Sequence, residues 1–350
     1  MTRPPSSGPG DPQMTVIGDG PPAEAPTSNI GGRRSAGTGT PNLGGRRSAG
    51  TGTPNLGGRP PPGASRPSAA LLAGMAVRAL RQEAYLSPKP GLADRRGRGA
   101  HDDMDLPLLL ASAEALRPTF RSVAEAAERT AAGVGLREEL GRLGRVGEVT
   151  MLRITRGVNT HRGALWVLGL LIAAVGGAAD EREAARHAAG LAVLPDRRLP
   201  SGAVSHGERA RRRYGVRGAR GEAEAAFPHV IEVALPRLRR SRAAGLTEET
   251  SRLDALLEVM SLLDDTCVLH RGGLEGLRVV RLGAERVLAE GGAGTDSGHA
   301  ALIELDERLT ARRLSPGGSA DLLAAALFLD TVPWPGHVAR AEREVLACRR

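Results

Sequence analysis

The chain has 350 residues and a formal net charge of +9, with 48 basic and 39 acidic side chains. Its two cysteines, Cys267 and Cys348, are far apart and lack metal-ligand spacing, which argues against a disulfide framework and a zinc site. The N-terminus lacks the apolar core of a secretory signal, and the most apolar run, 164–179, is shorter than the roughly 20 residues of a membrane span. We therefore expect a cytoplasmic protein that makes no membrane contact.

Residues 1–66 are dominated by Gly, Pro, Ser, Thr and Arg, so they cannot bury enough apolar surface to fold. The segment 31–43 recurs unchanged as 44–56, which indicates a recent duplication rather than a stacked repeat. We predict a disordered, non-catalytic tail. An arginine-bearing arm for nucleic acid is the alternative, but the tail has no aromatic residues to stack on bases.

Residues 67–350 have a helical pattern rich in Ala, Leu, Arg and Glu, without the alternating β-branched runs of strands. Ser68 is a candidate N-cap for a helix that ends before Pro88. This pattern predicts a single all-α domain. Further helices are expected near 104–116, 121–140, 145–155, 163–176, 180–192, 222–240, 247–263, 274–290, 298–313, 318–330 and 336–348.

The segment 87–105 contains the only lysine of the chain, Lys89, between Pro88 and Pro90. The prolines restrict the backbone, so Lys89 is presented on a stiff loop. The loop also supplies oxygen and nitrogen ligands suited to a cation with phosphate oxygens: Asp94, His101, Asp102, Asp103 and Asp105. The alternative is a charged surface loop followed by an acidic first helical turn.

The segment 157–163 (GVNTHRG) directly precedes the most hydrophobic helix. Asn159, His161 and Arg162 therefore lie beside the free amide groups of a helix N-terminus, where anions bind. An ordinary helix cap made by Thr160 is the alternative.

Two further segments are candidates. Asp264 and Asp265 are expected to close a helix, where negative charge calls for a compensating cation such as Mg²⁺ or an arginine. His270 and Arg271 follow in a polar loop. In 315–323, the amides of Gly317, Gly318 and Ser319, with Asp321 beside them, can receive a phosphate at a helix N-terminus, although the segment is not a Walker A motif.

In order along the chain, SPKPGLAD with GAHDDMD, GVNTHRG, DDTCVLHRGG and SPGGSADLL resemble the motifs of the triphosphoribosyl-dephospho-CoA synthases. This resemblance implies an all-helical enzyme that transfers the triphosphoribosyl part of ATP to the 2′-hydroxyl of 3′-dephospho-CoA and releases adenine. Glu222 and Phe227, after the arginine-rich connection 195–221, also match the family. That connection is then either a lid or a solvated linker.

The resemblance implies roles for these residues. Catalysis is expected from His101, Asp103, Asp105 and Asp265, the three aspartates also holding Mg²⁺ or facing the ribose. Lys89, Arg162 and Arg271 are expected to hold phosphates, and His101, His161 and His270 are alternative proton carriers. The remaining substrate-binding candidates are Asp94, Asn159, Glu222, Gly317, Gly318, Ser319 and Asp321.

The segment 317–330 is closer to the malonate decarboxylase branch of the family than to the citrate lyase branch. A separate holo-acyl-carrier-protein transferase and an acyl carrier protein are the expected pathway partners. Two other functions remain open: a Mg²⁺-dependent helical hydrolase of nucleotides or ADP-ribose, and a basic nucleic-acid-binding protein, which would show steep salt dependence.

Overall fold

The structure is a computed structural model that describes residues 66–199 and 206–335. Within these ranges all the regular secondary structure is helical, so the predicted all-α class is confirmed. The elements are α1 (Ala69–Tyr85), α2 (Leu106–Ala115), α3 (Arg117–Arg129), α4 (Val134–Ile154), α5 (Arg162–Val175), α6 (Glu181–Ala192), α7 (His206–Tyr214), α8 (Gly218–Glu224), the π-helix η1 (His229–Ala234), α9 (Leu235–Ala243), α10 (Glu248–Leu262), α11 (Thr266–Ala289), α12 (Asp296–Ala311) and α13 (Gly317–Thr331).

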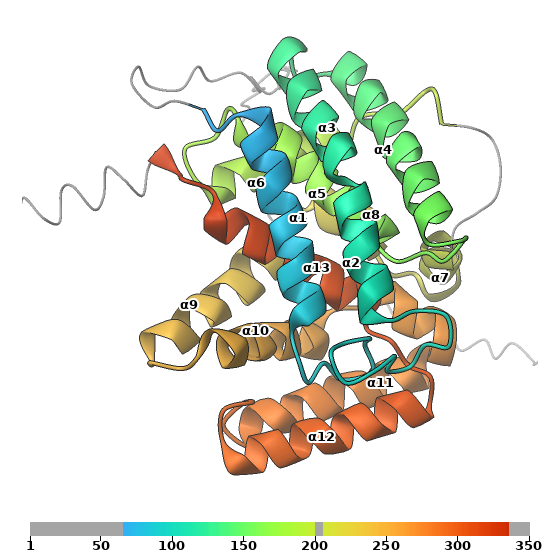
Figure 1. The fold of residues 1–350 in the computed structure, drawn as a ribbon, viewed down its shortest axis with the longest axis vertical. Coiled ribbons are helices and arrows are strands. Elements are labelled where there is room, and N and C mark those ends of the chain that lie inside the picture. Colours follow the sequence, from blue (N-terminus) through green and yellow to red (C-terminus); the bar gives the residue numbers. More distant parts are fainter. Residues whose placement is uncertain (1–65, 200–205, 336–350) are drawn as a thin grey trace, which may run out of the picture. The chain divides into compact units, whose positions relative to one another are not determined.

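The core is built around two helices that lack a polar face. α13 is buried on all sides from Leu322 to Leu329, and it packs against α1, α5 and α10. α5 is the predicted apolar helix, and its buried residues pack against α3, α6 and α13. α11 and α12 pack together on the side where the loop 86–105 lies (Figure 1).

The start of α1 is as predicted. Ser68 is the N-cap and its hydroxyl accepts a hydrogen bond from the amide of Leu71 at 3.3 Å. The helix ends at Tyr85, before Pro88, because a proline disfavours helical backbone in the residue before it. The predicted loop therefore begins where α1 ends.

The predicted helix break near 141–144 is wrong. α3 ends at Arg129, and α4 continues without interruption from Val134 to Ile154. Two glycines of α4 serve close packing: a Cβ on Gly141 would lie 2.0 Å from Asp196 Oδ2, and one on Gly147 would lie 2.8 Å from Thr119 Cγ2.

The expected single helix over 222–240 is also interrupted. Ala226 and Phe227 have positive φ angles of 62° and 55°, so the chain turns between α8 and η1. Glu222 holds the two pieces together, because its carboxylate accepts hydrogen bonds from the backbone amide and the Nδ1 of His229 at 2.9 and 2.8 Å. Part of the connection 195–221 is helical as well, since it contains α7 and the start of α8.

The expected polar loop over 264–273 is wrong. α11 already begins at Thr266, and Asp265 is its N-cap. Its negative charge therefore lies at the positive end of a helix, so the argument for a compensating cation does not hold for Asp265. Gly273, with φ of 60° and ψ of −157°, kinks α11 in the middle of the expected loop.

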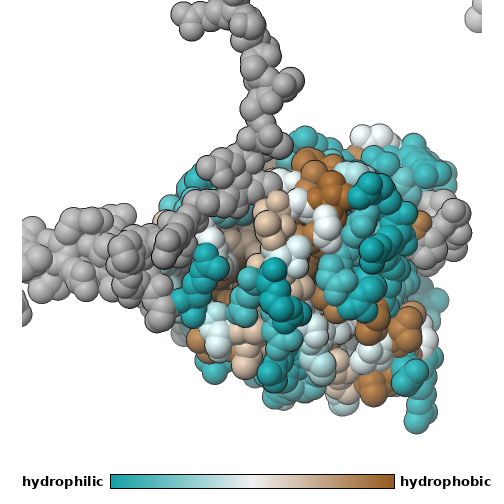
Figure 2. Space-filling model, turned by 90° about the horizontal axis from the view of Figure 1, so that it is seen from above, coloured by the Kyte–Doolittle hydropathy of each residue, from teal (hydrophilic) through white to brown (hydrophobic). Residues whose placement is uncertain are grey.

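The predicted tail and the predicted helix 336–348 lie outside the described residues. No helix among the described residues is long and apolar enough to cross a membrane. Figure 2 shows one face of the molecule, on which hydrophobic residues lie in small groups between hydrophilic ones. Such a mixture is ordinary for a protein surface.

Candidate active site

Lys89 lies at the centre of the candidate site. Its side chain is 1% exposed, and its Nζ lies 2.6 Å from Glu83 Oε1 at the end of α1. A buried ammonium is stable only when it is paired, so Glu83 accounts for its presence in the interior. Glu83 was not identified from sequence, although a glutamate spaced three residues from Leu80 on a buried helix stripe was a usable signal.

Asp94 organises the loop that carries Lys89. Its carboxylate accepts hydrogen bonds from the Ser87 hydroxyl at 3.1 Å, the Lys89 amide at 2.9 Å and the Arg96 amide at 2.7 Å. Burial alone would raise the pKa of Asp94, but the hydrogen bonds from Arg96 and Lys89 outweigh it and lower the pKa. Asp94 is therefore a buried anion that fixes the loop conformation.

A second set of contacts fastens this loop to α12. The amide of Gly91 donates to Asp306 Oδ1 at 2.9 Å, and Arg96 bridges Asp94 and Asp306 with ion pairs of 2.8 Å each. Gly91 has φ of 69°, and a Cβ there would lie 2.3 Å from the carbonyl oxygen of Leu314. Only glycine can adopt this positive φ angle and also leave room for the carbonyl oxygen.

His101 is held between α11 and the loop before α13. Its Nε2 lies 2.8 Å from the Ser315 hydroxyl, and Arg271 Nη2 lies 3.2 Å from its Nδ1. Because the guanidinium can only donate, Nδ1 accepts and the proton is assigned to Nε2. Burial and the charge of Arg271 lower the pKa of His101 to about 4, so the ring is neutral at pH 7.

His161 is the most deeply buried of the predicted site histidines. Its Nδ1 lies 2.8 Å from the hydroxyl of Ser112, whereas its Nε2 is buried and has no hydrogen-bond partner. Burial, with a smaller effect from the charge of Lys89, lowers the pKa of His161 to about 4. The result is a neutral imidazole with one nitrogen available to a ligand.

Asp321 links the N-terminal ends of α5 and α13. A Cβ on Gly163 would lie 1.9 Å from Asp321 Oδ2, so the glycine allows the carboxyl group to reach the first turn of α5. Burial, followed by the negative charges of Glu83 and Asp265, raises the pKa of Asp321 well above its ordinary value. The pKa of Asp321 is thus raised, whereas the pKa of His161 is lowered.

Asp265 is fully engaged by the protein. Its Oδ1 accepts from the amides of Cys267 and Val268 at 2.9 and 3.4 Å, and its Oδ2 accepts from the amide and hydroxyl of Ser319 at 2.9 and 3.1 Å. Burial nevertheless raises its pKa. A protein carboxylate thus occupies the position at the start of α13 where a phosphate was predicted, and it ties α11 to α13.

The glycines before Ser319 allow this approach. A Cβ on Gly318 would lie 3.1 Å from both carboxylate oxygens of Asp265, and one on Gly317 would lie 3.2 Å from Cys267 Sγ. The phosphate cradle of Gly317, Gly318 and Ser319 remains a prediction, and Asp265 already uses the Ser319 donors.

The other predicted residues lie around this centre. Asp103 has a 65% exposed side chain 3.9 Å from His101 Nδ1, and Asp105 caps α2 by accepting from the amide of Leu108 at 3.0 Å. Asn159 is exposed and accepts from the amide of Arg162 at 3.2 Å. The Arg162 side chain pairs with Glu148 on α4, and the exposed His270 lies on α11.

These positions do not form a magnesium site from Asp103, Asp105 and Asp265. The carboxylate of Asp103 is exposed, and that of Asp105 caps α2. The carboxylate of Asp265 is buried, and its oxygens already accept hydrogen bonds from the protein. In the ranges 66–199 and 206–335, no group of three or more His, Cys, Asp or Glu side chains is arranged to hold a metal ion. The three aspartates therefore do not fit Mg²⁺ as joint ligands.

The substitution Asp265→Ala is expected to destabilise the protein by about 3 to 5 kcal/mol, because it leaves buried donors of α11 and α13 without an acceptor. Asp265→Asn should also destabilise it, since the amide NH₂ would face another donor. Urea unfolding followed by circular dichroism measures both effects. Asp264→Ala is the matched control, because Asp264 is exposed and pairs only with Arg281. An Asp265→Ala variant as stable as this control would contradict the interpretation.

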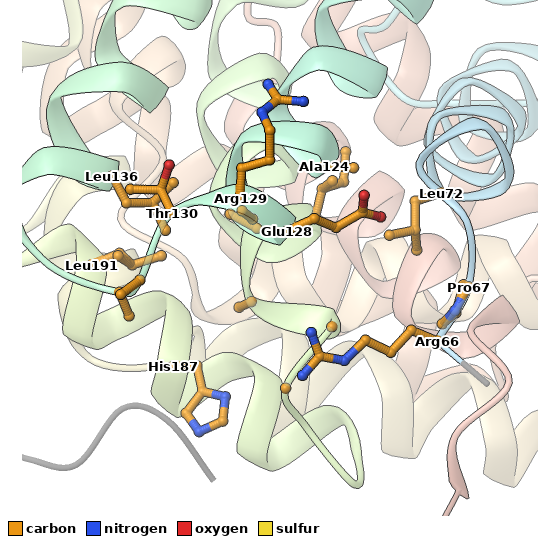
Figure 3. Close-up of a pocket in the computed structure, with 18 residues that line it drawn as sticks. Arg66, Pro67, Leu72, Ala124, Glu128, Arg129, Thr130, Leu136, His187 and Leu191 are labelled. Atoms are coloured by element: carbon orange, nitrogen blue, oxygen red, sulfur yellow. The ribbon is translucent and has the colours of Figure 1, made fainter. Parts of the chain in front are cut away.

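A cavity of about 370 Å³ lies away from this site. It is lined by the first turn of α1, the end of α5 and the junction of α3 and α4, with Arg66 and His187 at its edge (Figure 3). The candidate site contains the opposite ends of α1 and α5, about 20 Å away along helices of this length. None of the predicted site residues lines this cavity.

These features define an all-helical protein in which the N-terminal ends of α5, α11 and α13, a buried lysine and two neutral histidines meet at one place. Helix N-termini and perturbed titratable groups together are typical of sites that act on anionic substrates. The family model CitG, described as ATP:dephospho-CoA triphosphoribosyl transferase, matches residues 69–338. The chain belongs to this family and is a transferase.

Relatives named probable 2-(5″-triphosphoribosyl)-3′-dephosphocoenzyme-A synthase support this assignment. The protein of Azotobacter vinelandii is 56% identical over 271 residues, which cover 76% of this chain and 92% of that protein. The protein of Pseudomonas paraeruginosa is 55% identical, and the match covers 76% of this chain and 94% of that protein. The protein of Pseudomonas savastanoi pv. phaseolicola is 54% identical, and the match covers 78% of this chain and 95% of that protein. No solved structure matches the chain.

Proposed function

We propose that this protein transfers the triphosphoribosyl group of ATP to the ribose 2′-hydroxyl of 3′-dephospho-CoA and releases adenine. The family match and the names of the relatives support this reaction. The bond between the anomeric carbon and adenine breaks, and a bond from that carbon to the 2′-oxygen forms. The hydroxyl loses one proton and adenine gains one, so the protein must accept and supply a proton.

The observation that carries this proposal is a pair of opposite pKa shifts, at His161 near Lys89 and at Asp321 near Glu83, the partner of Lys89. The pKa of His161 is lowered to about 4, while the pKa of Asp321 is raised well above its ordinary value. Two titratable groups whose environments push their pKa values apart are suited to be base and acid. We assign the free Nε2 of His161 as the acceptor of the hydroxyl proton and Asp321 as the donor to adenine.

Phosphate binding falls to the cations at the same place. Lys89 acts electrostatically on both His101 and His161, and Arg271 lies against His101. We propose that these two side chains bind the triphosphate. Arg162 at the first turn of α5 pairs with Glu148, as Lys89 pairs with Glu83, and is a further candidate for this role. His101 positions Arg271, and no step is assigned to a metal ion held by Asp103, Asp105 and Asp265.

We further propose that the product is the prosthetic-group precursor of malonate decarboxylase. The segment 317–330 supports this branch over citrate lyase. The downstream partners would then be a holo-acyl-carrier-protein transferase and the acyl carrier protein of that enzyme. Deletion of the gene in its host should abolish malonate decarboxylase activity and spare citrate lyase. The reverse result would assign the other branch.

The direct test is to incubate the protein with ATP and Mg²⁺, with and without 3′-dephospho-CoA, and to measure adenine and product mass by chromatography. We expect adenine only when the acceptor is present, with a matching gain in acceptor mass. Adenine or phosphate released without the acceptor would instead indicate a hydrolase. Absence of turnover under both conditions would contradict the proposed reaction.

A further inference from the structure

A second cavity of about 200 Å³ lies between α4 and α5, outside the cluster around Lys89. Its polar lining comes from Arg137, Arg145 and Glu148 on α4, Arg162 and Trp166 on α5, and Asp196 after α6. Most of the rest is apolar, including Leu140, Leu165 and Leu170, with three glycines. Arg162 belongs to the motif 157–163 and Asp196 to the connection 195–221, whereas the other lining residues were not singled out in the sequence.

The wall of this cavity contains buried hydrogen-bond donors that lack acceptors. Arg137 is only 8% exposed, yet its Nε and Nη1 have no hydrogen-bond partner. The Nε1 of Trp166 and the Nε of Arg162 are also buried without partners. The Arg137 guanidinium stacks over the Trp166 ring at 4.9 Å, which holds both groups in place. Such unmet donors are rare in folded proteins, so each of them calls for an acceptor from a water molecule or a ligand.

The acidic residues of the cavity do not accept hydrogen bonds from these donors. Asp196 Oδ2 accepts from Arg145 Nη1 at 2.8 Å and lies 3.7 Å from Arg137 Nη1, beyond hydrogen-bond distance. Its other oxygen accepts from the amide of Arg198 at 3.1 Å, and Glu148 pairs with Arg162. The cavity therefore offers spare donors on an otherwise apolar wall, so its ligand must be an acceptor-bearing, mainly apolar chain.

The cavity is lined by Arg162, the neighbour of His161 in the chain. Arg162 is the first residue of α5 and follows His161, whose Nε2 is assigned to the reacting hydroxyl. The lining positions on α5 continue from Arg162 to Leu170, about 12 Å along the helix axis. A substrate held by its ribose at His161 can thus extend a chain of this length along α5.

We propose that this cavity binds the pantetheine arm of 3′-dephospho-CoA, with its amide carbonyls accepting hydrogen bonds from Arg137 and Trp166. The identity of the acceptor rests on the proposed function. The arm has the required character, because its carbonyl oxygens are separated by apolar methylene and methyl groups. Specific recognition of the acceptor would then depend on residues far from the reacting atoms.

The substitution Arg137→Met separates binding from folding. Since Nε and Nη1 of Arg137 have no hydrogen-bond partner in the free protein and Nη1 lies 3.7 Å from Asp196, an apolar side chain of similar length should change the melting temperature little. Asp196 keeps its contacts with Arg145 and the Arg198 amide, so no carboxylate is left unpaired. Arg142→Met is the matched control, because Arg142 lies on the same helix but is exposed and pairs only with Glu139.

The kinetic test compares the two substrates of one reaction. In Arg137→Met, the KM for 3′-dephospho-CoA should rise about tenfold, whereas the KM for ATP should stay within twofold of the wild type. Trp166→Phe, which retains the ring and removes only the donor, should show a smaller rise of the same kind. Equal changes in both KM values, or no change in either, would overturn the proposal.

A binding experiment tests whether the cavity holds the arm without relying on catalysis. Phosphopantetheine should change the fluorescence of Trp166 in the wild type and in Arg142→Met, with affinity reduced about tenfold in Arg137→Met. Trp334, the other tryptophan, is buried and hydrogen-bonded to the Leu329 carbonyl, so Trp166→Phe should lose the response. If the protein binds phosphopantetheine saturably but does not turn over ATP with 3′-dephospho-CoA, the proposed reaction is refuted and the proposed binding site is kept. A response to inorganic pyrophosphate but not to phosphopantetheine would show an anion site and overturn the proposal.

Discussion

Lys89→Met should be the most damaging single substitution in the candidate active site. It removes the cation assigned to the triphosphate, so kcat/KM for ATP should fall by about a thousandfold or more. It also leaves Glu83 buried and unpaired close to Asp321, which should lower the free energy of unfolding by about 3 to 5 kcal/mol. Steady-state kinetics and urea unfolding measure the two effects separately.

A double variant distinguishes the catalytic from the structural role of Lys89. Glu83→Gln with Lys89→Met removes both charges, so stability should largely return while activity stays lost. Arg81→Met is the matched control on α1, because its ion pair with Glu114 is exposed and is worth less than about 1 kcal/mol. Near-wild-type turnover in the folded double variant would exclude Lys89 from triphosphate binding.

His161→Gln should reduce kcat by about 100- to 10,000-fold, the range for loss of a proton acceptor. Glutamine can still bond to Ser112 but cannot take up a proton at this position. Because the pKa of His161 is about 4, wild-type kcat should not decline near pH 6.5, where an ordinary histidine titrates. A His161→Gln variant with the wild-type rate would assign the proton acceptor elsewhere.

The same residue makes stability depend on pH. Between pH 6.5 and about 4, His161 is protonated in the unfolded chain but neutral in the folded protein. Protons then favour the unfolded state, so the wild type should lose a few kcal/mol of stability as the pH falls through this range. His161→Gln should lose less, and His101→Gln with His161→Gln less still, because His101 has the same low pKa. Thermal unfolding at pH 7, 5.5 and 4.5 measures these differences, with exposed His299→Gln as the control.

Local features of the fold were predictable from sequence. The Ser68 cap, the apolar helix after His161 and the loop after Pro88 depend on residues within a few positions of one another. Helix breaks were predicted less well. Glycine at 141 and 144 looks like a break, but the glycine at 141 meets a carboxylate that arrives from residue 196.

The sequence predicted which segments form the candidate site, but not which of their polar groups are already paired. The motifs located Lys89, His161, Arg271 and Asp321. They did not show that Asp265 is saturated by Ser319, which lies 54 positions further along the chain. Glu83 was missed because its position on the buried stripe of α1 was overlooked, and its partner Lys89 lies in the loop beyond the helix.

By itself, the sequence determined the helical class, the family and the segments that carry the chemistry, since periodicity, caps and motifs are properties of neighbouring residues. Only the tertiary structure decided which of those polar groups are already paired and which are not. It placed Asp265 at a helix N-terminus, left Nε2 of His161 and the donors of Arg137 without partners, and separated the pKa values of His161 and Asp321. Burial and pairing depend on residues brought together from distant positions, and both protonation and ligand binding follow from them.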